Sequence, residues 1–312
     1  MEQKKYVDIE RFKEKYDNVF KIGEWITITE KVDGSNAAFT YDTETQSLVA
    51  FSRRNQLNEA NNLNGFWNWV QRLNTNQVMI LTQNGRYIIF GEWLTKHSIR
   101  YPDHRYKQFY MFDVWDKETE EYLPHEDTFA IFRGLEKAAQ ITGEVINFVP
   151  VFYTGPFQGW DHVYSFVGKS DLYAEPCGEG IVIKSQDRLD NKYSGTPAYL
   201  KIVSEQFSEV HGHKIKAVDT DALKKKEAER ALVAAIATER RAEKCLQKLI
   251  EDQIVPEDWD EKSMGIIAKN LPKNVYEDCL KEEHDLVLAC ENFGKFCGGI
   301  VMGYAKEWLK KR

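Results

Sequence analysis

Short runs rich in β-branched and aromatic residues, separated by turn residues, occupy the first two thirds of the chain. Seven of these runs predict β-strands: residues 25–32, 47–52, 86–94, 108–115, 145–153, 179–185 and 198–203. Because many connections are short, we expect most strands to pair antiparallel. Helical periodicity is visible at 61–73 and 126–141, where apolar residues recur at steps of three and four. The pattern predicts a mixed α+β body.

The pattern changes near residue 219. From there, DALKKKEAERALVAAIATERRAEKCLQKLIED consists almost entirely of strong helix formers, with Asp219 and Thr220 as candidate N-caps. The helical pattern then continues over three segments: 256–271, 272–292 and 294–311. We therefore expect an α+β body over residues 1–212 and an all-helical domain of about four helices over residues 219–312.

The composition is that of a folded protein, with 42% hydrophobic and 29% charged residues among 312. No run of about 18 apolar residues occurs, and the start of the chain has no apolar segment of the signal-peptide type. We therefore expect a cytoplasmic protein. The five cysteines are odd in number and lack C-x-x-C spacing, which argues against a disulfide framework or a structural zinc site.

Signals for nucleic-acid binding are mixed. The net charge of −7 counts against a broad basic face, although a local basic site is enough to grip a strand end. The stretch HSIRYPDHRYKQFY (97–110) interleaves basic and aromatic residues, which suits RNA phosphates and stacked bases and equally suits an exposed loop. The pair His211 and His213 lacks a nearby third ligand for a metal ion.

The tetrapeptide Lys31-Val32-Asp33-Gly34 closes the run WITITEKV. Alternation along the run puts Lys31 on the same face as Thr29 and opposite Ile28, so we expect Lys31 to point away from the core, into a cleft or solvent. An Asp-Gly turn lets the backbone reverse close to a ligand. A lysine at a strand end is usually only a solvated charge. The tetrapeptide therefore indicates a function only together with the further motifs that follow it in the chain.

Five further motifs follow in order: Ser52-Arg53-Arg54, Phe90-Gly91-Glu92, Phe112-Asp113, Glu179-Gly180-Ile181-Val182-Ile183-Lys184 and Leu200-Lys201-Ile202-Val203. The series resembles the covalent nucleotidyltransferases, which comprise ATP-dependent DNA ligases, RNA ligases and mRNA-capping enzymes. It is most similar to the RNA ligase 2 family, which shares the lysine motif through Asn36, a Phe-Ser-Glu at 207–209 and a helical C-terminal domain.

The resemblance implies a nucleotidyltransferase body of the ATP-grasp-like ligase kind and a lysyl-AMP reaction that uses ATP and Mg²⁺. Catalytic roles fall on Lys31, Lys201 and Glu179, and Glu179 would bind magnesium through water. Contacts to ATP are implied for seven further residues: Glu30, Val32, Asn36, Arg53, Glu92, Phe112 and Lys184.

These residue types suit that chemistry. A free lysine is mostly protonated at neutral pH, whereas desolvation and nearby cations favour the neutral amine that can attack phosphorus. Lys201, or Lys184, would supply such a cation and stabilise charge on the phosphate. Phe112 would stack on adenine, Glu92 would bind ribose and Arg53 would hold a phosphate or a strand end. Taken singly, each residue also fits a surface turn, a core position or a buried strand.

The last motif departs from the family, which commonly holds two lysines separated by one residue. Here the corresponding pair is Lys201 and Val203, or Tyr199 and Lys201 if the register shifts, so one phosphate-binding charge is missing. Lys214 or Lys216 would replace it, unless their segment is only a polar joint between the domains.

Two assignments depend on local geometry. The choice of Arg53 over Arg54 depends on where the 41–47 turn places a short insertion. Strand parity sets Glu179 and Lys184 on opposite faces unless the glycine between them breaks the register.

The expected function is ATP-dependent joining of RNA 3′-hydroxyl and 5′-phosphate ends, at nicks or splints in duplex RNA, by a monomer. One alternative is a DNA ligase or capping-type transferase, for which a β-rich oligonucleotide-binding barrel would follow residue 215. Another is an RNA-binding protein built on a decayed ligase body, which Val203 favours.

Overall fold

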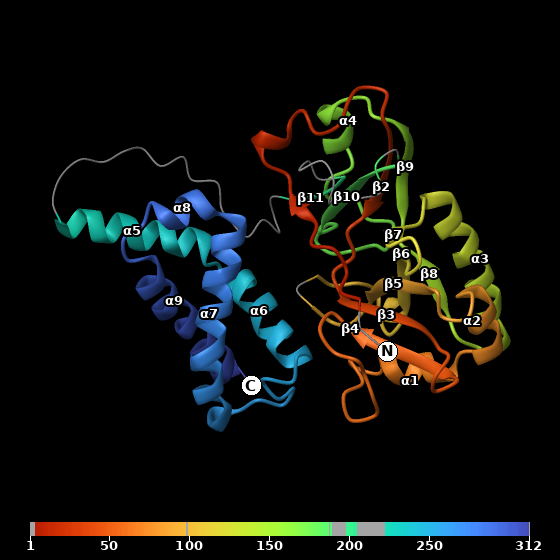
Figure 1. Cartoon of the computed structure of the whole chain (residues 1–312). Coiled ribbons are helices and arrows are strands. Elements are labelled where there is room, and N and C mark those ends of the chain that lie inside the picture. The colour runs from red at the N-terminus through yellow and green to blue at the C-terminus, as the bar shows by residue number, and fades with distance from the viewer. Residues whose placement is uncertain (1–3, 98, 187, 189–197, 205–221, 312) are drawn as a thin grey trace. The chain divides into compact units, whose positions relative to one another are not determined.

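The computed structural model describes residues 4–97, 99–186, 188, 198–204 and 222–311, with the backbone alone for 222–227. The chain divides into two compact units, Met1–Ser204 and Glu205–Arg312. The first unit contains two largely antiparallel sheets with helices, and the described part of the second is helical (Figure 1). The α+β prediction is therefore confirmed. Several positions discussed above lie outside the described residues: 207–209, His211, His213, Lys214, Lys216, Asp219 and Thr220.

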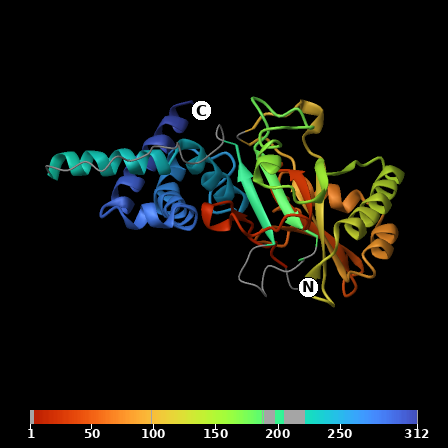
Figure 2. The ribbon, with the colours of Figure 1, turned by 90° about the horizontal axis from the view of Figure 1, so that it is seen from above.

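A five-stranded sheet carries Lys31 at the end of one strand. Its order is β1-β11-β10-β2-β9, with these bounds: β1 Glu10–Arg11, β2 Trp25–Glu30, β9 Val151–Pro156, β10 Gly180–Ser185 and β11 Tyr199–Val203. Figure 2 shows β10 and β11 running side by side. Ile26 and Ile28 pack on one face of this sheet with Phe157 and Val163, the latter from α4 (Trp160–Tyr164). That face is the hydrophobic side that the alternation of β2 predicts.

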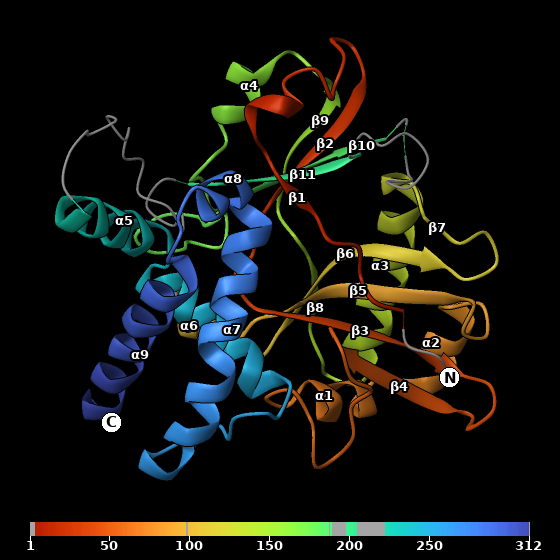
Figure 3. The same ribbon diagram turned by 60° about the vertical axis from the view of Figure 1, so that its left-hand side comes forward.

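A second sheet has six strands in the order β4-β3-β5-β6-β7, with β8 beside β6. The bounds are β3 Ser35–Asp42, β4 Ser47–Ser52, β5 Tyr87–Trp93, β6 Phe109–Asp116, β7 Glu121–Tyr122 and β8 Ile146–Phe148. One side packs against three helices: α1 Phe66–Arg72, α2 Thr75–Leu81 and α3 His125–Ile141 (Figure 3). Short 3₁₀ helices lie at η1 Glu14–Tyr16 and η2 Asp103–Arg105.

The other side of the six-stranded sheet meets the five-stranded sheet. Ala38, Phe90 and Trp115 from the former pack in one buried cluster with Ala198 and Tyr199 from the latter. The two sheets are therefore joined by a small apolar contact, and Lys184, Lys201, Phe112 and Asp113 belong to the faces that this contact brings together.

The predicted strand 145–153 is wrong as a single element. It is divided at Val149 and Pro150 into β8, which pairs with β6, and β9, which pairs with β2 in the other sheet. Proline cannot donate to a strand ladder, so the chain leaves one sheet there and enters the other. The sequence also missed β3, where small and polar residues alternate with Phe39 and Tyr41, and it missed α2.

The second unit consists of five α-helices in its described part: α5 Ala222–Ile236, α6 Glu239–Glu251, α7 Met264–Glu282, α8 His284–Leu288 and α9 Phe293–Lys311, with the 3₁₀ turn η4 Glu261–Ser263. The predicted continuous helix after residue 219 is broken because Thr238 caps α6, accepting the N–H of Arg241 at 3.3 Å. The predicted boundary at residue 272 is also wrong, since α7 continues through Pro272. Helices α7 and α9 pack around a core that includes Leu271 and Val301.

Two further findings concern the whole described chain. None of its helices is long and apolar enough to cross a membrane. None of the five cysteines forms a disulfide in the structure, and four of them are buried.

Candidate active site

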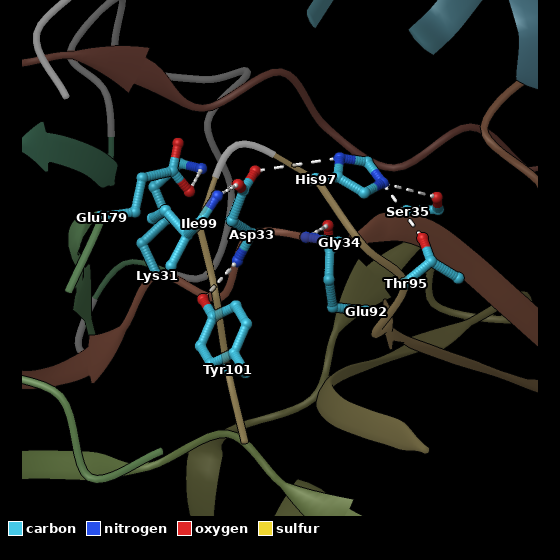
Figure 4. Close-up of polar contacts among 10 residues, drawn as sticks. All are labelled: Lys31, Asp33, Gly34, Ser35, Glu92, Thr95, His97, Ile99, Tyr101 and Glu179. Atoms are coloured by element: carbon cyan, nitrogen blue, oxygen red, sulfur yellow. Dashed lines mark hydrogen bonds and ion pairs between the residues drawn. The ribbon is translucent and has the colours of Figure 1, made fainter. Parts of the chain in front are cut away.

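Lys31 and Glu179 form the centre of the site. The N–H of Lys31 donates to the carbonyl of Gly180 at 3.0 Å, which keeps the chain beside β10 after β2 has ended. The Nζ of Lys31 lies 2.6 Å from Oε2 of Glu179, a carboxylate that is 1% exposed (Figure 4). The two side chains form a charge-assisted hydrogen bond. In this state Lys31 is therefore held by an anion rather than by the cations expected from the sequence.

A glycine at position 180 makes this arrangement possible. A Cβ there would lie 2.1 Å from the carbonyl oxygen of Ile202, so any larger residue would force β10 away from β11. Glu179 precedes this point, and its side chain reaches Lys31 from the start of the strand. The sequence analysis set Glu179 and Lys184 on opposite faces by strand parity. Because Glu179 lies before the start of β10, this parity does not separate it from the site.

Register places three lysines on one face of the five-stranded sheet. Lys184 lies opposite Thr27, and Lys201 lies opposite Val182, which in turn lies opposite Thr29. Directly opposed residues share a face of an antiparallel pair, and alternate residues of a strand do so too. Lys31 follows Thr29 by two residues, so the sheet presents Lys31, Lys184 and Lys201 on one side.

Val203 occupies the register position that faces Lys31. It lies opposite Gly180, whose carbonyl accepts the Lys31 N–H, whereas Lys201 lies one row further along β11. Gly180, which lies between Lys31 and Val203, has no side chain. The position where the family commonly has its second lysine is thus the nearest register position of β11, and here it holds an apolar residue.

The turn after Lys31 approaches β5 closely. The Oε1 of Glu92 accepts the N–H of Gly34 at 3.2 Å, and a Cβ on Gly34 would lie 2.7 Å from the carbonyl oxygen of Trp93. Asn36 lies directly opposite Glu92 in the β3–β5 ladder. Asn36 and Glu92 therefore lie together beside the lysine turn, as the predicted nucleotide contacts require.

A β-bulge directs Phe112 and Asp113 to the same side of the six-stranded sheet. Phe90 pairs with Asp113 and Gly91 with Met111, which leaves Phe112 as the extra residue. Asp113 binds Lys184 at 2.6 Å in a buried ion pair, and the ammonium group lies 5.4 Å from the ring centre of Phe112. The bulge thus joins the predicted adenine-stacking ring to the predicted nucleotide-binding lysine.

Tyr6 was missed by the sequence analysis because it precedes every motif. Its hydroxyl donates to Asp113, and its ring lies 4.9 Å from that of Phe112 in an edge-on arrangement. Burial raises the pKa of Tyr6 well above its usual value, so the hydroxyl remains a donor. Oδ2 of Asp113 therefore accepts hydrogen bonds from both Tyr6 and Lys184.

Three predicted ATP contacts are placed differently from the rest. Glu30 lies on the face opposite Lys31, where its carboxylate accepts bonds from the Ser170 hydroxyl and the Asp171 N–H. Burial raises the pKa of Glu30 to about 7. The guanidinium of Arg53 pairs with Asp8 at a partly exposed position, and Val32 is buried. The structure does not bring these three side chains to the Lys31–Glu179 pair.

The stretch 97–110 is partly internal, with Ser98 outside the described residues. Tyr101 and Tyr110 are buried, so their rings are not available to stack on RNA bases. Exposed basic side chains remain at His104 and Lys107. Tyr101 instead binds the backbone of the lysine turn, a role that no local sequence signal indicated.

The donor set suits magnesium rather than a protein-only metal cage. In the described part of the chain, no group of three or more His, Cys, Asp or Glu side chains could hold a metal ion. Magnesium keeps most of its waters and commonly takes one or two carboxylates together with substrate phosphates. Glu179, buried beside Lys31, fits that requirement as a single carboxylate.

A lysine at a strand end, paired with a buried carboxylate on a two-sheet α+β body, is the arrangement expected of a covalent nucleotidyltransferase. The chain belongs to the RNA ligase family, whose family model matches residues 24–203, more than half of the chain. No curated protein matches it.

Several solved structures are similar in fold. They include a mutant of the Naegleria gruberi RNA ligase with ATP and Mn, at 20% identity and a TM-score of 0.47, with 66% of this chain and 57% of that chain covered. The same ligase with PPi matches at 18% identity and a TM-score of 0.45, again covering 66% and 57%. This chain therefore spans less than two thirds of the length of those ligases.

Proposed function

We propose that this protein is an ATP-dependent RNA ligase that carries AMP on Lys31 and joins a 3′-hydroxyl to a 5′-phosphate in RNA. The observation that carries the proposal is the Lys31–Glu179 pair at 2.6 Å, in a chain of the RNA ligase family. Lys184 and Lys201 lie on the same face; Lys184 is paired with Asp113, so Lys201 is the one proposed to supply positive charge to the triphosphate.

The proposed reaction has three steps. Nζ of Lys31 attacks the α-phosphorus of ATP, a phosphorus–nitrogen bond forms and pyrophosphate leaves. The AMP then moves to the 5′-phosphate of an RNA strand and frees the lysine. The neighbouring 3′-hydroxyl attacks that phosphate, the phosphodiester forms and AMP leaves. A nicked or splinted duplex is the proposed substrate, because it holds the two ends next to each other.

Activation of Lys31 is the chemical problem of the first step. The ammonium must lose a proton before Nζ can attack, and in this structure it is paired with the buried Glu179 carboxylate. Magnesium, held by Glu179 through water and by the phosphates, would supply positive charge beside this pair, which favours the neutral amine. Lys201 on the same face stabilises the charge that develops on the α-phosphate.

The proposal is tested with ATP labelled on its α-phosphate in the presence of magnesium. Wild-type protein is expected to acquire a covalent label that survives denaturation, and Lys31→Ala is expected to acquire none. A matched control is Lys21→Ala, because Lys21 lies on an exposed loop of the same unit and its variant should label as wild type does. Undiminished label in Lys31→Ala, or no label in wild type, would remove the ligase proposal.

One observation favours a second candidate, an RNA-binding protein on a decayed ligase body. Val203 stands where a second lysine would face Lys31. The absence of that lysine would weaken adenylylation. An RNA-binding protein would show no label but would still retain RNA in a gel-shift assay. A DNA ligase or capping enzyme is disfavoured because residues 222–311 form helices, and label from GTP in place of ATP would reverse that judgement.

A further inference from the structure

The segment after β5 grips the backbone that follows Lys31. The N–H of Asp33 donates to the hydroxyl of Tyr101 at 3.0 Å, and Oδ2 of Asp33 accepts the N–H of Ile99 at 3.0 Å. Figure 4 shows the Tyr101 hydroxyl directed at this backbone group and Ile99 beside the carboxylate. Residue 33 is therefore bound through both its backbone and its side chain.

Tyr101 is itself rigidly held. It is 6% exposed, and its N–H donates to the hydroxyl of Tyr106 at 2.9 Å. Burial raises the pKa of the Tyr101 hydroxyl above its usual value, so the group is neutral at physiological pH. A neutral phenol beside the turn accepts the Asp33 N–H without adding charge near the lysine.

His97 anchors the other edge of the same segment. Its Nε2 lies 3.1 Å from Oγ1 of Thr95 and 3.3 Å from Oγ of Ser35, and its Nδ1 lies 3.9 Å from Oδ1 of Asp33. The ring therefore touches the residues on both sides of the turn: Asp33 and Ser35 in the chain after Lys31, and Thr95 in the chain after β5 (Figure 4).

These contacts fix three backbone N–H groups between residues 31 and 34. The N–H of Lys31 is bound by Gly180, that of Asp33 by Tyr101 and that of Gly34 by Glu92. The first belongs to the five-stranded sheet, and the other two come from the chain in and after β5. The short segment from Lys31 to Gly34, which we call the lysine bridge, is thus held by hydrogen bonds at both ends.

We propose that Tyr101 and His97 are positioning residues that clamp the lysine bridge, so that Nζ of Lys31 reaches the α-phosphorus in line with the departing pyrophosphate. The inference rests on the proposed function and adds to it the residues that aim the nucleophile. An in-line displacement depends steeply on geometry, and a displacement of about 1 Å can lower a rate by about 100-fold. Neither residue is required to touch ATP.

The test compares Tyr101→Phe with Tyr122→Phe. Tyr122 is a matched control because it is also 6% exposed and its hydroxyl also accepts a backbone N–H, that of Val7, at 3.0 Å. Single-turnover label formation from α-labelled ATP is followed over a range of ATP concentrations. For Tyr101→Phe, the maximal rate is expected to fall at least about tenfold while the half-saturating ATP concentration stays within about twofold of wild type. For Tyr122→Phe, both values should match wild type.

A second variant tests the proposal independently, and a folding control accompanies it. His97→Ala should show the same pattern, a lower maximal rate at an unchanged half-saturating ATP concentration, while thermal unfolding confirms that all variants are folded. Equal rates for Tyr101→Phe and Tyr122→Phe in folded proteins, or a change confined to ATP binding, would overturn the clamp and leave the proposed function intact. Absence of label in wild type would contradict the proposed function and the clamp together.

Discussion

At the scale of single residues, the site departs most from expectation in the charge next to Lys31. The sequence analysis expected cations to hold the lysine neutral, whereas the nearest partner is the Glu179 carboxylate at 2.6 Å. Val203 adds no charge at the facing position of β11. Under the proposed function, the chemistry of the site depends on how bound ATP and magnesium would change the environment of this one ion pair.

A pH prediction follows for the neighbouring Glu30. Burial raises its pKa from 4.5 to about 7, so the folded protein keeps a proton that the unfolded chain releases between those values. Stability must therefore fall as pH rises from about 4.5 to 7, by about 3 kcal/mol, and stay level above that range. Urea unfolding of wild type and Glu30→Gln at several pH values measures this term. A stability difference between the two that does not change with pH would show that Glu30 titrates normally.

At the scale of elements, the sequence indicated most strands correctly because their cores are β-branched and aromatic. The run 47–52 coincides with β4. The sequence prediction failed where a strand's pairing depends on partners that are distant in the chain. The strands β8 and β9 are continuous in the apolar pattern but pair in different sheets. The bulge at Phe112 also has no local signature, because it exists only in register with Phe90 and Gly91.

The candidate site shows the same division. Motif order singled out Lys31, Glu179, Glu92 and Lys184 as predicted site residues, and in the structure each has a contact near the lysine or the bulge. Tyr101 could not be selected in this way, because its role arises from a contact across 68 positions in the sequence. Glu30 is the opposite case, a residue that the sequence analysis selected and that the structure places away from Lys31. Because the two residues are adjacent in an extended chain, their side chains lie on opposite faces.

The buried pair of Lys184 and Asp113 tests how the two sheets are joined. The charged groups lie 2.6 Å apart, with side chains 10% and 8% exposed. Lys184→Met or Asp113→Asn alone should each cost about 3 kcal/mol of unfolding free energy, because either change leaves a buried charge without its partner. The double variant should cost clearly less than the sum. Additive losses in a urea double-mutant cycle would mean that the pair is not coupled.

At the scale of the whole molecule, the chain comprises two units, each with its own buried core. In the described part of the second unit the core is made entirely of its own residues, from Val233 to Ala305. Its helix α6 is amphipathic, and Thr238 caps its N-terminus. A unit of this kind meets the requirements for independent folding.

The prediction at this scale is that residues 219–312 fold when produced alone. Their core includes buried side chains on α5, α6, α7 and α9, which is the usual construction of a stable helical bundle. Circular dichroism should show a helical spectrum and a cooperative thermal transition. A gradual, non-cooperative loss of ellipticity would indicate that this unit depends on the rest of the chain.

The central claim is that the amine at position 31 becomes covalently joined to AMP. Its most direct test is peptide mapping by mass spectrometry, under conditions that preserve phosphorus–nitrogen bonds, after incubation with ATP and magnesium. We expect one adenylyl group per chain, on the peptide that contains Lys31 and on that side chain. An adenylyl group on Lys184 or Lys201 instead, or an unmodified protein, would contradict the account.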